Sequence, residues 1–311
     1  MDNLVFPWTQ NIPDLKAVHK GKVRETAETP FLDVDGGQLL VVLATDGIST
    51  HNLVHNSRIK GKGEVLTALT IFWLEKLKKA GINTHLFKYG HRIYDYLPPG
   101  DYPEDFHHRT LIVKKLIMDL VEQIFRAYLT GSFYDKFYSK GLANPYGIDL
   151  PAGLDLMYKF PEPIYTPTDK SETDEPLDAR ETMEQYAEAY NVSRRVFDLV
   201  RTHLNSVGLE LVDSKFEVGI DCLGRVTVGD EIGTLDSSRF ADLAQITLGK
   251  NPPWLDKQLA RDEAERIWAG GPKFSLTFSP EIVNQLTKTY LAIFKRITGE
   301  SLEDFQRQVL N

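Results

Sequence analysis

Residues 209–219 read Leu209-Glu210-Leu211-Val212-Asp213-Ser214-Lys215-Phe216-Glu217-Val218-Gly219. Side chains alternate across a β-strand, so residues two apart share a face. Asp213, Lys215 and Glu217 are therefore predicted to project together, and the apolar residues Val212, Phe216 and Val218 to enter a core on the other face. Three charges at this spacing are costly to bury without partners, so this strand is the first candidate for a functional site.

A return strand is expected directly after this one. Residues 219–229 read as a turn and a second strand, with Asp221-Cys222-Leu223-Gly224 as the turn. If the loop has two or four residues, an odd position on one strand faces an even position on the other. Asp230 then shares the face of the three charges, opposite Lys215 in one register and opposite Glu217 in the other.

This set of charges suits a hard cation and a phosphate. Mg²⁺ prefers one or two carboxylates together with water and phosphate oxygens, and a lysine can neutralise a reacting carboxylate or phosphate. The polar loop that follows ends near Arg239, whose guanidinium is able to grip either anion with two parallel hydrogen bonds. The alternative is a solvated sheet face that carries charges of both signs.

The composition places bounds on the remaining function classes. A chain of 311 residues suits two domains or one large lobed enzyme. The formal net charge is −8 and no basic run offsets it, which argues against nucleic acid or an anionic membrane as a partner. Cys222 is the one cysteine, so an intrachain disulfide and a cysteine metal cluster are excluded.

The location expected from the sequence is the cytoplasm. The start, Met1-Asp2-Asn3-Leu4, lacks the basic and apolar regions of a signal peptide. No apolar run approaches the length that spans a bilayer. A homo-oligomer is compatible with the sequence.

The rest of the chain mixes strand and helix patterns. Strands are predicted at 39–44 and 111–113, and an extended segment at 161–167. The apolar residues of 116–129 fit the period of a helix and also that of a strand. Helices are predicted at 64–80 with Gly81 as C-cap, at 178–190, from a Ser193 N-cap to Gly208, and over much of the chain after Asp256.

Seven stretches carry a resemblance to a known family. They are Gly21–Glu25, Ala44–Ser49, Arg126–Ser132, Thr166–Lys170, Leu211–Gly219, Gly229–Phe240, and Asp256–Gln258 with Arg261–Asp262. Any one of them is weak evidence. Together and in this order they resemble the SAICAR synthetases of purine biosynthesis.

The resemblance implies an α+β fold with two lobes, similar to the ATP-grasp architecture, with antiparallel sheets and a helical C-terminal part. It implies an N-terminal sheet lobe over ATP phosphates at 1–115, a lobe with the substrate and metal site at 116–255, and a helical part at 256–311. No glycine-rich Walker loop is needed for such a site, and Gly61-Lys62-Gly63-Glu64 lacks the Walker spacing.

The activity that the resemblance implies is the ATP-dependent ligation of L-aspartate to carboxyaminoimidazole ribonucleotide (CAIR), with ATP and Mg²⁺ as cofactors. Phosphorylation turns the carboxylate of CAIR into an acyl phosphate that an amine can attack. Three anionic reactants meet, so cations are needed to offset their repulsion.

The family's site residues fall on positions of this chain with matching chemistry. ATP is expected at Lys22, Arg24, Lys114, Glu217 and Asp230, and Mg²⁺ at Glu217 and Asp230. The reacting centre is expected at Asp213 and Lys215, and the substrate at Asp46, Ser49, Arg126, Ser132 and Arg239.

The chain departs from the family's pattern in the predicted substrate loop. Gly47 stands where the family has arginine, His51 where it has an aromatic residue, and Asn52 where it has aspartate. Two alternatives follow: a relative that ligates a different pair of substrates, and a nucleotide-binding protein without catalysis.

Overall fold

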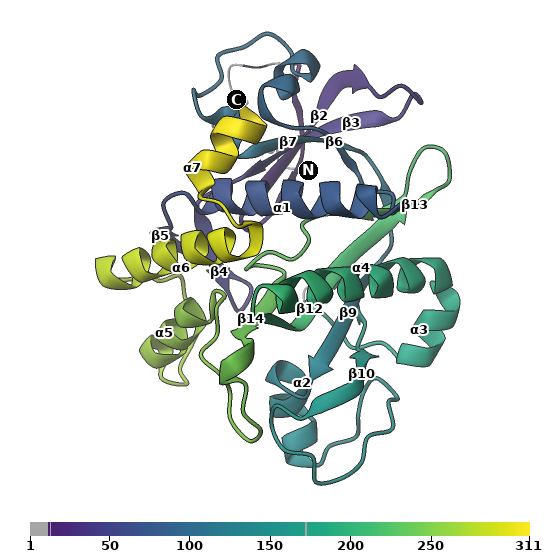
Figure 1. Cartoon of the computed structure of the whole chain (residues 1–311), viewed down its shortest axis with the longest axis vertical. Helices are drawn as coiled ribbons and strands as arrows, with labels where there is room; N and C mark the ends of the chain where they lie inside the picture. The colour runs from purple at the N-terminus through teal and green to yellow at the C-terminus, as the bar shows by residue number, and fades with distance from the viewer. Residues whose placement is uncertain (1–11, 13, 172) are drawn as a thin grey trace.

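Two antiparallel sheets, one above the other in Figure 1, frame the part of the chain that this computed structural model describes, residues 12, 14–171 and 173–311. The predicted α+β class is confirmed. The start of the chain, where no signal peptide is expected, lies outside the described residues. Among the described residues, no helix is long and apolar enough to span a membrane.

The first sheet has five strands in the order β1-β2-β3-β7-β6. Their bounds are β1 Lys16–Lys20, β2 Arg24–Leu32, β3 Gln38–Ala44, β6 Leu86–Lys88 and β7 Thr110–Lys114. The predicted strands at 39–44 and 111–113 are confirmed. Along β3, Leu39 and Val41 are buried in a core, whereas Leu40 and Val42 line a cleft on the other face. A separate hairpin pairs β4 (Gly47–Thr50) with β5 (Leu53–Arg58).

The second sheet has seven strands around a central β12. Their bounds are β8 Ile117–Met118, β9 Val121–Tyr128, β10 Lys159–Tyr165, β11 Thr168–Asp169, β12 Leu209–Ile220, β13 Val226–Gly229 and β14 Ser238–Asp242. The stretch 116–129, which fits both periods, forms β8 and β9 because β12 pairs with both. The predicted core face of β12 is confirmed, since Val212, Phe216 and Val218 are buried.

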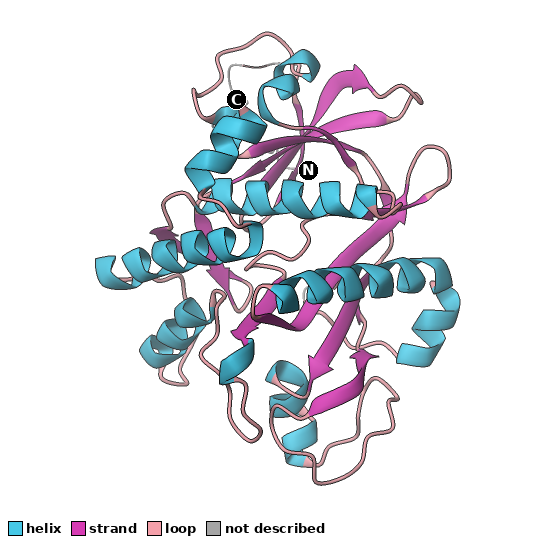
Figure 2. Ribbon diagram, viewed as in Figure 1, coloured by secondary structure: helices cyan, strands magenta, loops and turns pink. Residues whose placement is uncertain are grey.

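Helices cover the two sheets (Figure 2). Their bounds are α1 Lys62–Lys79, α2 Gly131–Lys136, α3 Ala179–Gln185, α4 Ala187–Ser206, α5 Gln258–Trp268, α6 Pro280–Thr298 and α7 Leu302–Phe305. Short helical turns lie at Gly90–Tyr96, Phe106–His108, Tyr138–Lys140, Leu243–Gln245 and Gln306–Leu310. One buried apolar cluster joins α1, α4, α6 and β12. The division into three parts at 115 and 255 stays a prediction, although the first sheet lies wholly before residue 115 and the second wholly between 116 and 255.

The predicted start of α4 is wrong. The helix begins at Ala187, and Ser193 lies inside it, fully buried. The buried stripe of α4 already begins at Ala189 and runs through Ser193 to Val196. Helical packing therefore continues through a residue type that favours N-caps. The break between α3 and α4 falls at Tyr186, where φ is −115° and ψ is 40°.

The predicted register of the β12–β13 hairpin is also wrong. Glu217 pairs with Gly229 and Ile220 with Val226, which leaves a five-residue loop. Asp221 closes this odd loop, because its Oδ1 accepts from the backbone N–H groups of Leu223 and Arg225, both at 3.0 Å. Asp230 therefore lies beyond the last strand pair rather than within it.

Candidate active site

A cleft of about 1440 Å³ lies between the two sheets. Strands β2, β3 and β7 and helix α1 line one side of it, and β9 and β12 line the other. Pockets for one small ligand usually measure about 300–1,000 Å³. This cleft therefore has room for a nucleotide and a second substrate together.

The β9 and β12 strands form one polar wall of the cleft. Asp213 pairs with Arg126 and Lys215 with Ile124 in an unbroken antiparallel register. Residues directly opposite each other share a face, so Glu122 and Arg126 project on the same side as Lys215 and Glu217. All four line the cleft. The charged face predicted for β12 thus lies beside a charged face of β9.

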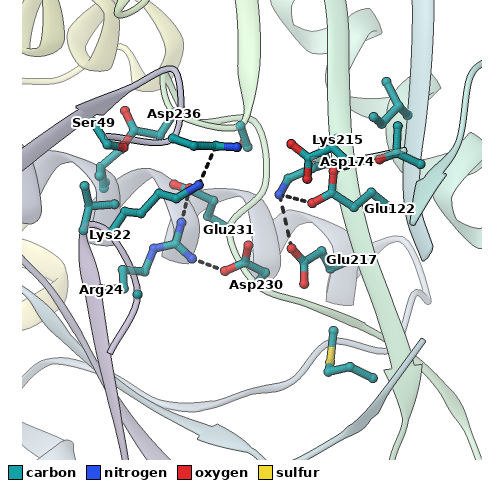
Figure 3. Close-up of a pocket in the computed structure, with 18 of the residues that line it drawn as sticks. Lys22, Arg24, Ser49, Glu122, Asp174, Lys215, Glu217, Asp230, Glu231 and Asp236 are labelled. Carbon is teal, nitrogen blue, oxygen red and sulfur yellow. Dashed lines mark hydrogen bonds and ion pairs between the residues drawn. The ribbon is translucent and has the colours of Figure 1, made fainter. Parts of the chain in front are cut away.

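Lys215 lies at the centre of this wall (Figure 3). Its Nζ donates to Glu122 Oε1 at 2.7 Å and to Glu217 Oε1 at 3.3 Å. Burial disfavours the charged amine, but Glu217 and Glu122 outweigh burial and raise the pKa of Lys215. Glu217 also pairs with Lys170. Lys215 is therefore a fixed cation that faces the cleft.

Asp230 reaches the same cleft by a route that the wrong register did not predict. It follows β13 directly and has a left-handed backbone, with φ of 54°. Its carboxylate and that of Glu231 both pair with Arg24, which comes from β2 in the other sheet (Figure 3). Burial opposes ionisation of Asp230, but Arg24 and Lys215 outweigh it and lower its pKa. A single arginine thus links the two sheets.

Asp213 lies opposite Arg126 on the same face of the sheet and contacts two arginines. Its Oδ2 accepts from Arg126 Nη1 at 2.7 Å, and its Oδ1 from Arg239 Nε at 3.0 Å. Burial would raise the pKa of Asp213, but Arg239 and Arg126 outweigh burial and lower it. Arg126 lines the cleft, whereas Asp213 and Arg239 do not. The geometry shows Asp213 in contact with both arginines, and its place at the reacting centre stays a prediction.

The remaining predicted residues divide between the wall and its support. Lys22, Ser49, Lys114 and Ser132 line the cleft. Asp46 does not, because its Oδ1 accepts from the backbone N–H of Gly63 at 2.9 Å, at the start of α1. The structure therefore places Asp46 in the support of the substrate loop.

Two of these lysines already have polar partners. Lys22 Nζ donates to Asn52 Oδ1 at 2.6 Å, a neutral acceptor. Lys114 Nζ lies 3.2 Å from Asp33 and 3.6 Å from Asp35.

Several charged residues of the cleft are not among those predicted. They are Lys20, Glu122, Lys136, Asp174, Glu175, Glu231, Asp236, Lys257, Arg261 and Lys273. Glu122 was not predicted because residues 116–129 fit the period of a helix and also that of a strand, so the face of its side chain was undetermined. The side chain of Asp236 is 4% exposed, and its two oxygens accept from Lys62 Nζ and from Tyr290 OH, both at 2.7 Å. Lys257 and Arg261 lie in a stretch that carried the family resemblance without an assigned role.

The donor set allows a magnesium ion only together with a ligand. Among residues 12, 14–171 and 173–311, no three His, Cys, Asp or Glu side chains are arranged to hold a metal. Mg²⁺ commonly takes just one or two protein carboxylates and completes its shell with phosphate oxygens and water. Glu217 and Asp230 supply hard oxygen donors of that kind on the cleft wall.

Comparison with known proteins identifies the family of this chain. The family model described as SAICAR synthetase matches residues 17–273. The chain is 32% identical over 308 residues to a phosphoribosylaminoimidazole-succinocarboxamide synthase of Xanthomonas oryzae pv. oryzae (strain PXO99A), with 94% of this chain and 97% of that protein covered. It is 32% identical over 305 residues to the protein of the same name from Stenotrophomonas maltophilia (strain K279a), with the same coverage.

Solved structures show the same architecture. The SAICAR synthase of Saccharomyces cerevisiae, in complex with SAICAR, is 29% identical and superposes with a TM-score of 0.79, covering 92% of this chain and 96% of that one. A type-2 SAICAR synthetase in complex with ADP has the same fold, at 24% identity and a TM-score of 0.62, over 91% of this chain and 98% of that one. The family model, the relatives and the shared fold together show that this chain belongs to the SAICAR synthetase family.

Proposed function

We propose that this chain joins L-aspartate to CAIR, with conversion of ATP to ADP and phosphate, and so forms SAICAR. The observation that carries the proposal is the wall of β9 and β12, where Lys215 is fixed between Glu122 and Glu217 and opposite the Arg24 pair with Asp230. Carboxylate activation by ATP needs this combination of cations and oxygen donors. Two relatives that are 32% identical to this chain carry the name of this activity.

The reaction has two balanced steps. A carboxylate oxygen of CAIR attacks the γ-phosphorus of ATP, the bond to the β-phosphate oxygen breaks, and ADP leaves. The aspartate amine then attacks the acyl carbon of the acyl phosphate, loses a proton, and expels phosphate. The ammonium group of Lys215 stabilises the negative charge on the transferring phosphoryl group and on the acyl oxygen.

The ATP phosphates are assigned to the side of the cleft formed by the first sheet. Lys22, Arg24 and Lys114 line that side. Arg24 is held in place because it already pairs with two carboxylates, Asp230 and Glu231, in the segment that follows β13. Phosphate oxygens that bind Arg24 would take over the role of Asp230 and Glu231 as its anionic partners.

Mg²⁺ is assigned to Glu217 and Asp230. When bound, the ion neutralises phosphate charge and polarises the γ-phosphorus. These residues would supply oxygen donors to the ion, and Lys215, whose pKa is raised by Glu217 and Glu122 against the effect of burial, lies beside Glu217.

The phosphate and carboxylate of the ribonucleotide are assigned to the end of the cleft lined by Arg126 and Ser132, with the predicted substrate residue Arg239 directly behind Asp213 and outside the cleft lining. Asp213 holds both guanidinium groups in place. Arg239 also packs beside Gly131, where the Cβ of any other residue would collide with its guanidinium. Gly131 has φ of 60°, so a glycine is needed there on both grounds.

Purified protein with ATP, Mg²⁺, CAIR and L-aspartate tests the proposal. Release of ADP and phosphate together with SAICAR, dependent on all four additions, is expected. Folded protein that releases no ADP under these conditions would overturn it. Turnover with another acid or amine would identify a ligase of different specificity, and nucleotide binding without any turnover would identify a non-catalytic relative. Restored growth of a purine auxotroph that lacks this step is the matching result in cells.

A further inference from the structure

The last turns of the chain pack against the first turn of α1 (Figure 1). We call residues 302–311 the terminal segment; it consists of α7 and the helical turn Gln306–Leu310. Phe305 and Leu310 are buried in the same apolar cluster as α1, and the ring of Phe305 packs edge-on against Phe294 of α6 at 5.6 Å. The terminal segment lies beyond residue 273, where the match to the family model ends.

Two further contacts fix the position of the terminal segment. Asn311 Oδ1 lies 2.8 Å from His107 Nε2 and 3.1 Å from His108 Nε2. A Cβ at Gly90 would come within 2.4 Å of the backbone oxygen of Leu310, and Gly90 has φ of 62°. Glycine is needed there on both grounds. The terminal segment therefore has a defined seat on the turns that precede β7.

From that seat Gln306 reaches the start of α1. Gln306 Nε2 donates to Glu64 Oε2, and Glu64 Oε1 accepts from Arg109 Nη2 at 2.9 Å. Glu64 lies in the first turn of α1, where the helix dipole favours a negative charge. The side chains of Glu64 and Arg109 are 19% and 20% exposed, so most of this bridge is shielded from water. One carboxylate thus joins the terminal segment to Arg109.

Arg109 holds carboxylates from three segments of the chain. Besides Glu64, it contacts Asp105 Oδ2 at 3.1 Å and Asp46 Oδ1 at 3.5 Å. One guanidinium therefore serves three negative charges, which its rigid fork of N–H groups is suited to do. Its backbone oxygen also accepts from the N–H of Ala44 at 2.9 Å. The Arg109 side chain does not line the cleft, so its effect on the cleft passes through these partners.

Asp46 fixes the beginning of the substrate loop, residues 44–52. Its Oδ1 accepts from the N–H of Gly63, and its backbone oxygen accepts from the N–H of Ile59 at 2.8 Å. A Cβ at Gly63 would lie 2.4 Å from the backbone oxygen of Ala44, so α1 begins in direct contact with this loop. Residues 49–52 of the loop line the cleft. The first turn of α1 therefore sets the position of this part of the cleft wall.

We propose that Arg109 is a positioning residue for the substrate loop, and that the terminal segment maintains its geometry through Gln306 and Glu64. The amide of Gln306 satisfies one oxygen of Glu64, so Arg109 supplies only the other and stays in reach of Asp46. Without that amide, Glu64 would take two parallel hydrogen bonds from the guanidinium and draw it away from Asp46. The inference rests on the proposed function only for the identity of the substrate that the loop meets.

Gln306→Ala in the full chain tests this inference. We expect the KM for CAIR to rise about fivefold, with kcat within about twofold and the KM for ATP within about threefold, because coupling between distant sites is commonly of this size. Arg109→Lys keeps the charge but loses the fork, so the KM for CAIR should rise by about tenfold or more. Gln308→Ala is the matched control, because Gln308 lies in the same turn and is exposed. Its kinetics should equal those of the unmodified chain.

An exchange of partners separates positioning from a general loss of packing. Gln306→Glu places a second carboxylate against Glu64 and should raise the KM for CAIR more than Gln306→Ala does. Adding Glu64→Gln restores each hydrogen bond with donor and acceptor exchanged, because the new amide donates to residue 306 and still accepts from Arg109. The KM for CAIR in this double variant should return to within about twofold of the unmodified chain. A double variant no better than Gln306→Glu would overturn the inference.

Hydrogen exchange gives a readout that does not depend on turnover. In Gln306→Ala, the backbone amides of residues 44–52 and 59–63 should exchange about tenfold faster, and those of β12 should keep their rates. Unchanged exchange in the substrate loop would overturn the inference, and so would equal acceleration in both sheets, which would show a purely structural role. If the unmodified chain turns over and the KM for CAIR does not change in Gln306→Ala, the inference fails alone. If the unmodified chain shows no CAIR-dependent turnover, the proposed function fails, and the exchange rates still decide whether the terminal segment positions the loop.

Discussion

The two ends of the cleft handle charge in opposite ways. The paired end consists of Arg24, Glu122, Lys215, Glu217 and Asp230, each with an oppositely charged partner. Lys257, Arg261 and Lys273, here called the cationic corner, also line the cleft. In the described part of the chain none of the three forms an ion pair within 4.0 Å, although Asp236 raises the pKa of Lys257 against the effect of burial. A ligand at the paired end must exchange partners with groups that are already satisfied, whereas an anion at the corner gains contacts without breaking an ion pair.

This difference indicates that the two groups of charges have different roles. Paired charges are held in fixed positions, which is what stabilisation of a transition state requires. Unpaired cations attract an anion but impose less geometry, which suits the binding of a substrate before it reacts. Substitutions at the paired end should therefore affect the rate of the chemical step and the exchange of partners, and substitutions at the corner should affect affinity.

The largest effect is expected for Lys215→Met. Loss of the ammonium leaves Glu122 and Glu217 without the cation between them and removes the stabilisation of the transferring phosphoryl group. We expect kcat to fall at least ~10³-fold, which corresponds to about 4 kcal/mol. Steady-state kinetics with circular dichroism as a check on folding would measure it.

Lys170→Met is the matched control for that experiment. Lys170 also pairs with Glu217 but does not line the cleft, so its loss should change kcat by less than about tenfold. Near-normal activity of Lys215→Met would remove Lys215 from the mechanism. Equal losses in both variants would show that the state of Glu217, rather than Lys215, limits the rate.

Arg24→Gln tests whether the paired end exchanges partners. The variant lacks the cation that occupies Asp230 and Glu231, so these carboxylates should bind Mn²⁺ in the absence of nucleotide, which the unmodified chain should not do. The KM for ATP should rise roughly 30-fold, or about 2 kcal/mol, because a charged hydrogen-bond donor to phosphate is lost. Calorimetric titration with Mn²⁺ measures the first effect independently of activity.

Lys16→Gln serves as the control for Arg24, since Lys16 lies in the neighbouring strand but is 82% exposed. Its Mn²⁺ binding and ATP kinetics should match those of the unmodified chain. If Arg24→Gln gains no affinity for Mn²⁺, Arg24 does not compete with a cation, and the exchange model is wrong.

The sequence predicts much of the paired end but little of the corner, for a physical reason. Alternation along β12 is a local property, so the shared face of Lys215 and Glu217 can be predicted from spacing alone. Asp230 was placed correctly for the wrong reason, because the loop length was assumed to be even and the left-handed backbone at Asp230 compensates. The corner depends on how α5 packs on the β4–β5 turn, which is a tertiary contact between distant segments.

The same distinction explains why the contacts of Asp213 and Asp46 were not predicted. Asp213 belongs to the charged face by alternation, but two arginines from β9 and β14 enclose it. Asp46 belongs to a loop predicted to face substrate, but its Oδ1 accepts a hydrogen bond from the backbone N–H of Gly63 at the start of α1. In both cases the residue type was predicted and the partner was not, since partners are set by the pairing of elements rather than by local pattern.

Acid should lower the free energy of unfolding through His85, which lies beside the paired end. This buried histidine lines the cleft, and the backbone of Asp230 is a hydrogen-bond partner. Burial lowers the pKa of His85 to about 4, below the ordinary value of 6.5. The unfolded chain therefore binds the proton first, and stability present above pH 6.5 is lost as pH falls toward 4. Between pH 7.5 and 5.0 the loss should be about 2 kcal/mol.

Urea unfolding of the unmodified chain and of His85→Gln at these two pH values measures that contribution. The variant should lose about 2 kcal/mol less than the unmodified chain over the same interval, whatever its stability at pH 7.5. His108→Gln is the control, because His108 contacts Asn311 at an exposed position. Its free energy of unfolding should keep the full pH dependence of the unmodified chain. Identical pH dependence in His85→Gln and the unmodified chain would show that His85 does not hold its neutral form in the folded state.

The smallest expected effect is the most informative about substrate choice. Asn52 lies at the rim of the cationic corner and accepts from Lys22 Nζ at 2.6 Å, where the family usually has an aspartate. Asn52→Asp would convert this hydrogen bond into an ion pair and place a negative charge near the corner. We expect the KM for L-aspartate to rise roughly threefold, less than 1 kcal/mol, because exposed charges are screened by water.

Salt provides the internal check on this last prediction. The rise in the KM for L-aspartate should shrink as ionic strength rises, because the screening length becomes shorter. Asn56→Asp is the matched control: it makes the same change on β5, at a residue that contacts Thr277 and does not line the cleft. A fall in the KM for aspartate in Asn52→Asp would mean that the corner gains from a fixed Lys22 more than it loses from the added charge. The neutral residue at position 52 would then weaken the site, and the unpaired corner would compensate for it rather than create specificity.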